Sequence, residues 1–261
     1  MPWDKYCELL YQYCIQSCDI LNPYAAFRRQ LDITIPYKWE EQFANIERVF
    51  ERKEGPPVQM LEIKNVTDND VEDKVFRLQV LVALMLSYQN LPDAVTSAMQ
   101  KLREFGCNVE QLRAATSDRI SKCLFPLRYY RQRAEDIKKT VEILHEKYND
   151  DIPETLQDLW SLPGVKPITA LLASQYAWKR IEGIAVHLRL HLISNRLGWT
   201  CTSTYEDTKD ALEKFVPRGK WGVISEATYW FGTRICSFRP KCMSCVNKEI
   251  CPRLHARYLD D

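Results

Sequence analysis

The chain has 261 residues, of which 46% are apolar and 27% charged, and its formal net charge is +1. This composition excludes an intrinsically disordered chain. The small net charge means that any nucleic-acid binding must depend on a local basic surface. Eight glycines is a low number and disfavours a Rossmann-type fold. The sequence contains no run of 18 apolar residues, so it does not predict a membrane span.

The first 38 residues are rich in aromatic side chains and cysteine. Cys7, Cys14 and Cys18 have the spacing of one helix face. This predicts a partly buried helix that uses cysteine as a small hydrophobe, and the alternative is a ligand or partner surface. We therefore treat residues 1–38 as a candidate segment for binding protein partners.

The start of the sequence lacks a charged region followed by an apolar stretch, so it does not predict a secretory signal. Ten cysteines without such a signal indicate reduced thiols or metal ligands rather than disulfides. These features predict a nuclear protein, with the mitochondrion as the alternative location.

Helical periodicity dominates the rest of the chain. Residues 37–53 are amphipathic, and residues 73–89 are apolar nearly all round, which predicts a buried central helix. Residues 92–106 begin with Pro92 and end at Gly106, as a helix does. Apolar residues recur every three to four positions in the segments that follow, and patterns typical of strands are scarce. The predicted fold class is all-α.

A short turn, "LPGV" at residues 162–165, separates two of these helical patterns. Gly164 allows the backbone to approach a phosphate group and to direct its amides toward it. Lys166 follows the turn, and Pro167 suits the first position of the next helix. The segment therefore has the composition of a DNA-binding hairpin.

Four cysteines lie close together near the end of the chain, namely Cys236, Cys242, Cys245 and Cys251. Thiolates at uneven spacing in one compact loop favour a [4Fe–4S] cluster. Structural zinc is the first alternative, although zinc usually takes two short knuckles and only the middle pair forms one. The second alternative is that the cysteines bind no metal.

The hairpin and the cysteine array together resemble the endonuclease III family of DNA glycosylases, and most closely its eukaryotic branch. The resemblance covers residues 39–254 and includes "RLQVLVALMLSYQN" and "GIAVHLRLHLISNRLGWT". It implies a helix-hairpin-helix glycosylase fold of two helical domains. Residues 76–200 would form a six-helix barrel with the hairpin, and residues 39–75 and 201–261 the cluster domain.

The resemblance also implies that double-stranded DNA is the partner and that a damaged pyrimidine is flipped out of the duplex. In this family a lysine after the hairpin attacks the sugar, and an aspartate supports that step. Here the lysine position holds Ile168 and the aspartate position holds His187. An isoleucine has no lone pair, and a neutral imidazole supplies no fixed negative charge.

Lys166 stands two residues before the family's lysine, at the second hairpin glycine. Two residues along a helix rotate a side chain by about 200°, so we expect Lys166 to contact a phosphate or the solvent rather than to act as the nucleophile. The Cys236–Cys242 interval is also one residue shorter than the family's usual spacing.

Other positions retain features for DNA contact. Gln89 matches the glutamine that fills the gap left by a flipped base, and Tyr129 falls near the family's wedge residue. A basic and aromatic cluster suited to DNA surrounds Tyr129, and its alternative is a helix start with solvated arginines. The DNA-binding candidates are Gln89, Arg128, Tyr129, Arg131, Arg133, Gly164 and Lys166.

Because Ile168 and His187 replace the family's lysine and aspartate, we expect a protein that is not an enzyme. It would keep the glycosylase fold and act as a DNA-binding or protein-interaction scaffold in chromatin or genome regulation. One alternative is an active DNA repair glycosylase with a displaced nucleophile or a route through water. The other is a protein-binding module whose DNA face is vestigial.

Overall fold

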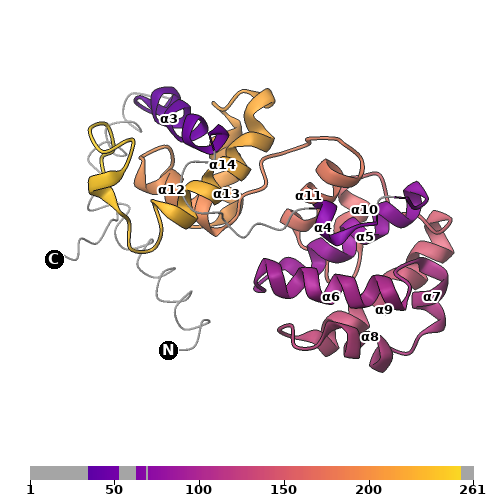
Figure 1. Cartoon of the computed structure of the whole chain (residues 1–261). Helices are drawn as coiled ribbons and strands as arrows, with labels where there is room; N and C mark the ends of the chain where they lie inside the picture. The colour runs from indigo at the N-terminus through magenta and orange to yellow at the C-terminus, as the bar shows by residue number, and fades with distance from the viewer. Residues whose placement is uncertain (1–34, 53–62, 69, 254–261) are drawn as a thin grey trace. The chain divides into compact units, whose positions relative to one another are not determined.

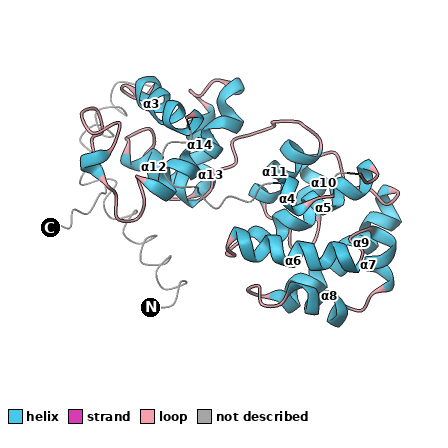
Figure 2. Cartoon of the chain, in the orientation of Figure 1, coloured by secondary structure: helices cyan, strands magenta, loops and turns pink. Residues whose placement is uncertain are grey.

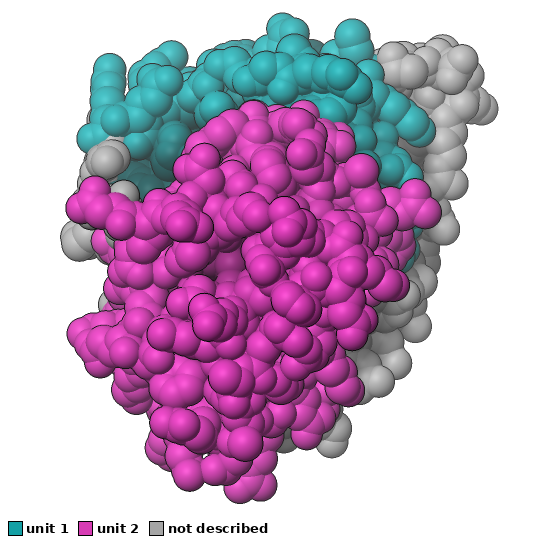
Figure 3. Space-filling view, turned by 90° about the vertical axis from the view of Figure 1, so that its right-hand side faces the viewer, with its two compact units in different colours: residues 1–58, 183–261 teal, residues 59–182 magenta. Residues whose placement is uncertain are grey.

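The structure, a computed structural model, describes residues 35–52, 63–68 and 70–253 (Figure 1). These residues form helices joined by loops, and no strand occurs among them (Figure 2). The predicted all-α fold class is therefore confirmed. The chain divides into unit 1, residues 1–58 and 183–261, and unit 2, residues 59–182 (Figure 3).

Unit 2 is built around one buried helix. In α5 (Asp73–Ser87), each residue from Leu78 to Leu86 is buried, which confirms the predicted central helix. Helix α5 packs against α11, α6, α4 and α9. The other helices of this unit are α4 (Ile63–Val66), α6 (Pro92–Phe105), α7 (Val109–Ala114), α8 (Ser117–Leu124), α9 (Tyr130–Tyr148), α10 (Leu156–Ser161) and α11 (Pro167–Ala177).

The ends of α6 follow the residues that the sequence provides. Pro92 occupies the first turn, where its missing N–H group costs no hydrogen bond. Gly106 ends the helix with a φ of 115°, and its N–H group donates to Leu102 O at 3.0 Å. A φ in this range favours glycine because it has no Cβ, so the predicted helix limits hold here.

Unit 1 packs α14 (Trp221–Arg234) against α12 (Leu188–Arg196) and α3 (Trp39–Glu51). Its core is aromatic: Phe43 and Trp199 have their ring centroids 6.2 Å apart in an edge-to-face arrangement. The close approach of α14 to α12 requires Gly232, since a Cβ there would lie 2.9 Å from Arg189 Cβ. The remaining elements are α13 (Tyr205–Glu213), η1 (Arg218–Lys220) and η2 (Cys242–Ser244).

Two expectations from the sequence concern other parts of the chain. The predicted interaction segment lies almost entirely outside the described residues, which begin at residue 35. The domain limits at residues 39–75, 76–200 and 201–261 stay a prediction. In the described part of the chain, no helix is long and apolar enough to cross a bilayer.

The central helix gives a direct test of the core. Leu81 in α5 is fully buried, so Leu81→Ala should lower the free energy of unfolding by about 2–5 kcal/mol through lost burial and a cavity. Leu91→Ala is the matched control because Leu91 is 71% exposed. Urea unfolding measures both, and an equal effect of the two variants would show that α5 is not the core of unit 2.

Candidate functional site

The hairpin between α10 and α11 forms as its sequence predicts. Leu162 and Val165 are buried, and the Val165 N–H group donates to Leu162 O at 3.1 Å, which closes the turn. Gly164 has a φ of 75°, and a Cβ there would lie 2.9 Å from Asp136 Oδ2. Both the backbone conformation and the packing therefore require glycine at this position.

Lys166 is the residue that precedes α11. It has extended backbone angles (φ −94°, ψ 161°), and Pro167 is the first residue of the helix. The rotation expected for a helical residue therefore does not apply to Lys166. Its exposed side chain places Nζ 3.4 Å from the centroid of the Tyr88 ring, as a cation–π contact.

Ile168 lies in the first turn of α11 and is half-buried. No side chain caps the N-terminus of α11. The N–H groups of a helix's first turn have no partner within the helix. The N-terminus of α11 thus has the hydrogen-bonding and electrostatic character that suits an anion such as phosphate.

Two loops beside the hairpin hold Gln89 and Tyr129. Both residues have a left-handed backbone, with φ values of 58° and 56°. Non-glycine residues in this region carry a cost of about 1–3 kcal/mol that the surrounding structure must offset. The loops are joined by Arg128 N, which donates to Asn90 Oδ1 at 2.9 Å. The side chain of Tyr129 is left 58% exposed.

The side chain of Arg133 connects the loop that holds Gln89 with the loop that holds Tyr129. Its guanidinium donates to the carbonyl oxygens of Met85, Tyr88 and Arg128. Burial is the largest influence on this group and lowers the pKa of Arg133. Of the arginines predicted to contact DNA, Arg133 therefore has a structural role, whereas Arg128 and Arg131 are exposed at the start of α9.

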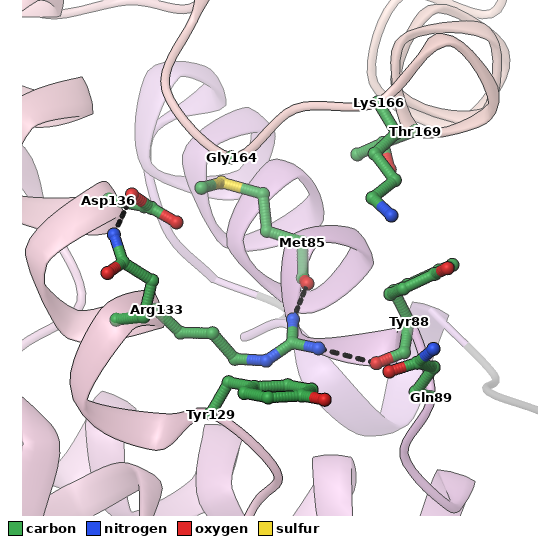
Figure 4. Close-up of a pocket in the computed structure, with 10 residues that line it drawn as sticks. Met85, Tyr88, Gln89, Tyr129, Arg133, Asp136, Gly164, Lys166 and Thr169 are labelled. Carbon is green, nitrogen blue, oxygen red and sulfur yellow. Dashed lines mark hydrogen bonds between the residues drawn. The ribbon is translucent and has the colours of Figure 1, made fainter. Parts of the chain in front are cut away.

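A cavity of about 380 Å³ opens between these elements (Figure 4). Figure 4 shows Lys166 directed from the hairpin toward Tyr88, with Gln89 and Tyr129 on the loops below it. The residues that line the cavity are Met85, Tyr88, Gln89, Tyr129, Gln132, Arg133, Asp136, Gly164, Lys166 and Thr169. All of them belong to unit 2.

The cavity brings together five of the seven predicted DNA-binding residues, and five further lining residues, Tyr88 and Asp136 among them, were not predicted. Tyr88 directly precedes Gln89 in the sequence, and no pattern marks it as a cavity residue. Asp136 could have been found from helical spacing, because it lies three residues after Arg133 and four after Gln132, on the same helix face. Gln132 Nε2 donates to Asp136 Oδ1 at 3.0 Å. The contact between Asp136 and Gly164 of the hairpin joins residues far apart in the sequence, so local sequence patterns do not reveal it.

His187 lies in unit 1, at the N-terminus of α12. Its Nδ1 accepts a hydrogen bond from Leu190 N at 3.2 Å, and its Nε2 lies 2.8 Å from Ser225 O. A carbonyl only accepts, so Nε2 carries the proton and the ring is neutral. Burial lowers the pKa of His187 to about 4. The ring caps the helix and supplies no negative charge.

The four C-terminal cysteines follow α14, and Cys242 is the first residue of η2. N–H groups point at three of the sulfurs: Arg196 Nη1 is 3.6 Å from Cys236 Sγ, Asn247 N is 3.4 Å from Cys245 Sγ, and Arg253 N is 3.3 Å from Cys251 Sγ. Such donors stabilise metal-bound thiolates and tune iron–sulfur clusters.

Burial, and to a smaller extent the charges of neighbouring cysteines, raise the pKa of Cys236, Cys245 and Cys251, the last to about 11. Thiolates at these positions therefore need a compensating positive group. Within the described residues no three side chains of the His, Cys, Asp and Glu types are grouped closely enough to hold a single metal ion. Four thiols, three of them with an N–H donor on the sulfur, have the donor chemistry that suits an iron–sulfur cluster.

Buried amides attach this loop to α3. Asn247 is fully buried, and its Nδ2 donates to Gln42 O at 3.0 Å. Asn45 Nδ2 donates to Asn247 Oδ1 at 3.0 Å, and Gln42 Nε2 donates to Ile250 O at 2.8 Å. These contacts join residues that are about two hundred positions apart, so the cysteine loop depends on α3 for its position.

Comparison with known proteins defines the class. Residues 82–218 match the profile of the HhH-GPD superfamily base excision DNA repair proteins. The solved structure of a non-covalent endonuclease III–DNA complex has a TM-score of 0.70 at 22% identity, covering 83% of this chain and 96% of that one. A trapped covalent endonuclease III–DNA intermediate has a TM-score of 0.69.

Sequence relatives narrow the class further. Endonuclease III-like protein 1 of Mus musculus is 39% identical over 220 residues, which is 83% of this chain and 73% of the mouse protein. Endonuclease III of Thermotoga maritima is 35% identical over 190 residues, which is 72% of this chain and 88% of that protein. The chain therefore belongs to the endonuclease III-like family of the HhH-GPD superfamily.

The expectation that this protein is not an enzyme is wrong. Its relatives are named as endonucleases, and the structures that resemble it include an endonuclease III trapped in a covalent intermediate with DNA. Ile168 and His187 remove the family's reactive groups at two positions only, and the cavity of unit 2 holds an amine and a carboxylate on other residues, Lys166 and Asp136.

Two buried histidines predict an acid-sensitive fold. Burial lowers the pKa of His187 and His191 from 6.5 to about 4. The unfolded chain binds more protons between these values, so the free energy of unfolding should fall as pH drops from about 6.5 to about 4. The loss is at most about 3 kcal/mol per ring. Urea unfolding across this range measures it.

His187→Asn keeps a capping acceptor but removes a titrating group, so its unfolding free energy should depend less steeply on pH. His145→Asn, which removes an exposed histidine, controls for the loss of one ring. A pH dependence in the His187 variant equal to that of the unmodified protein would contradict the assignment.

Proposed function

We propose that this protein is a DNA glycosylase that acts on a damaged base in duplex DNA, with the cavity of unit 2 in contact with the opened duplex. The observation that carries this proposal is the meeting of Gln89, Tyr129 and Lys166, from three separate loops, at one cavity. Membership of a base excision repair family supports the same activity.

The side chains suit this role individually. A base must leave the stack before its glycosidic bond can be reached, and the gap then needs a group to fill it. Exposed Tyr129 offers an aromatic face on which a base stacks, and Gln89 offers donors and acceptors for an unpaired base. Both residues have a left-handed backbone and line the cavity.

Phosphate contacts would come from the N-terminus of α11 and from the exposed cations Lys166, Arg128 and Arg131. With a formal net charge of +1, attraction to DNA depends on this local set. Binding should therefore weaken steeply with salt. Double-stranded DNA is the partner that this arrangement fits.

Base release from a duplex containing 5-hydroxyuracil, under single-turnover conditions, tests the proposal. Tyr129→Ala should slow release about tenfold or more, because stacking on an aromatic side chain contributes about 1–3 kcal/mol per base. Trp160→Ala is the matched control, since Trp160 is 59% exposed in the same unit but does not line the cavity. No release from damaged duplexes by the unmodified protein would overturn the proposal.

We also propose a [4Fe–4S] cluster on Cys236, Cys242, Cys245 and Cys251. When bound, such a group joins four points of the loop and offsets the charge of the thiolates. The amide N–H groups of Asn247 and Arg253 and the guanidinium of Arg196 then hold the sulfurs in place.

Loss of the buried amide should lower cluster content. Asn247→Ala removes the donor to Gln42 O and the acceptor for Asn45, which leaves buried polar groups without partners. We expect less iron and sulfide per chain and weaker visible absorbance in anaerobically purified protein. Asn65→Ala, at an exposed position, should match the unmodified protein. Zinc in place of iron, or no metal, would contradict the cluster.

A further inference from the structure

We infer that Lys166 is an amine that condenses with the aldehyde of an abasic site in duplex DNA, and that the carboxylate of Asp136 stabilises the positive charge formed. The inference rests on the proposed function, because release of a base leaves an abasic deoxyribose. That sugar in its open form has an aldehyde at C1′. Lysine amines form Schiff bases with carbonyl substrates.

Lys166 has the only primary amine among the ten residues that line the cavity. Arg133 also lines it, but a guanidinium stays protonated and this one is held by three carbonyl oxygens. The hydroxyl of Thr169 belongs to a buried residue. Ile168 offers no lone pair. Amine chemistry in this cavity therefore falls to Lys166.

The position of Lys166 keeps its amine within the cavity. Lys166 has extended backbone angles before α11, and its side chain points toward Tyr88 (Figure 4). The face of Tyr88 then receives the ammonium at 3.4 Å from the ring centroid. An aromatic face holds a cation without a strong directional bond, so the amine can leave Tyr88 when a sugar enters.

Asp136 places a negative charge in the same cavity. It is half-buried on α9, and its carboxylate lies against the hairpin, where only the absence of a Cβ at Gly164 gives it room. Gln132 fixes it through a hydrogen bond of 3.0 Å to Oδ1. A preorganised carboxylate stabilises a cation that develops nearby, and His187 provides no such charge because its ring is neutral.

The chemical step balances without a cofactor. The ammonium first loses a proton to solvent, which reaches it because Lys166 is exposed. The amine nitrogen then attacks C1′, the carbonyl π electrons move to oxygen, and that oxygen takes up a proton. Loss of water from the carbinolamine forms the C=N bond of a protonated imine. Hydrolysis reverses these steps and restores the amine.

Borohydride trapping on a duplex with a preformed abasic site tests the inference. Hydride adds to the imine carbon and leaves a stable secondary amine, so the unmodified protein should give a covalent adduct that maps to the peptide containing Lys166. Lys166→Arg keeps the charge but removes the amine, and should lower trapping by at least about 100-fold, a typical size for loss of a nucleophile. Its DNA affinity should stay within about threefold.

Controls separate chemistry from folding. Lys122→Arg changes a lysine that is 74% exposed and outside the cavity, and it should trap like the unmodified protein. Lys166→Arg with Ile168→Lys should regain trapping, which would show that the arginine variant folds. Asp136→Asn should slow trapping about tenfold with little change in DNA affinity.

The outcomes distinguish this inference from the proposed function. Undiminished trapping by Lys166→Arg, or an adduct on another residue, would overturn the role of Lys166. Base release by the unmodified protein without any adduct would also overturn it, while the glycosylase proposal would stand. Trapping at Lys166 without release of any damaged base would support the amine and overturn the glycosylase activity.

Discussion

The guanidinium of Arg133 is the contact on which the cavity depends. It holds the carbonyl oxygens of Met85, Tyr88 and Arg128, and so joins the end of α5, the loop that carries Gln89 and the loop that carries Tyr129. One planar guanidinium donates to all three carbonyl oxygens, of which that of Met85 is part-buried. The left-handed backbones of Gln89 and Tyr129 persist because the hydrogen bonds of Arg133 hold these two loops in place.

Positions 187 and 168, where this chain differs from the family, retain different parts of the family residue's role. At position 187 a carboxylate would both cap a helix and carry charge, whereas the histidine found there keeps the cap through Nδ1 and has no charge. At position 168 the amine is absent, yet Lys166 and Asp136 return an amine and a carboxylate to one cavity. The fold therefore tolerates these exchanges because its helices and hairpin do not depend on the reactive groups.

Sequence patterns predicted the helices well because the relevant forces are local. The apolar run in α5, Pro92 and Gly106 at the ends of α6, and Pro167 after the hairpin each act within a few residues. The cavity could be predicted only in part. Its aromatic and basic residues have recognisable composition, but the stacking of Lys166 on Tyr88 and the packing of Asp136 against Gly164 join distant segments. The ties between Asn247 and α3 were also beyond sequence reasoning, since they link opposite ends of the chain.

The most direct test of the role of Lys166 is a crystal structure of the protein with a duplex that contains a tetrahydrofuran analogue of an abasic site. We expect the analogue to lie in the cavity of unit 2, with the carbon equivalent to C1′ within reach of Lys166 Nζ and with Tyr129 and Gln89 inserted into the duplex. An analogue bound beside Ile168 or His187, with Lys166 still stacked on Tyr88, would contradict it.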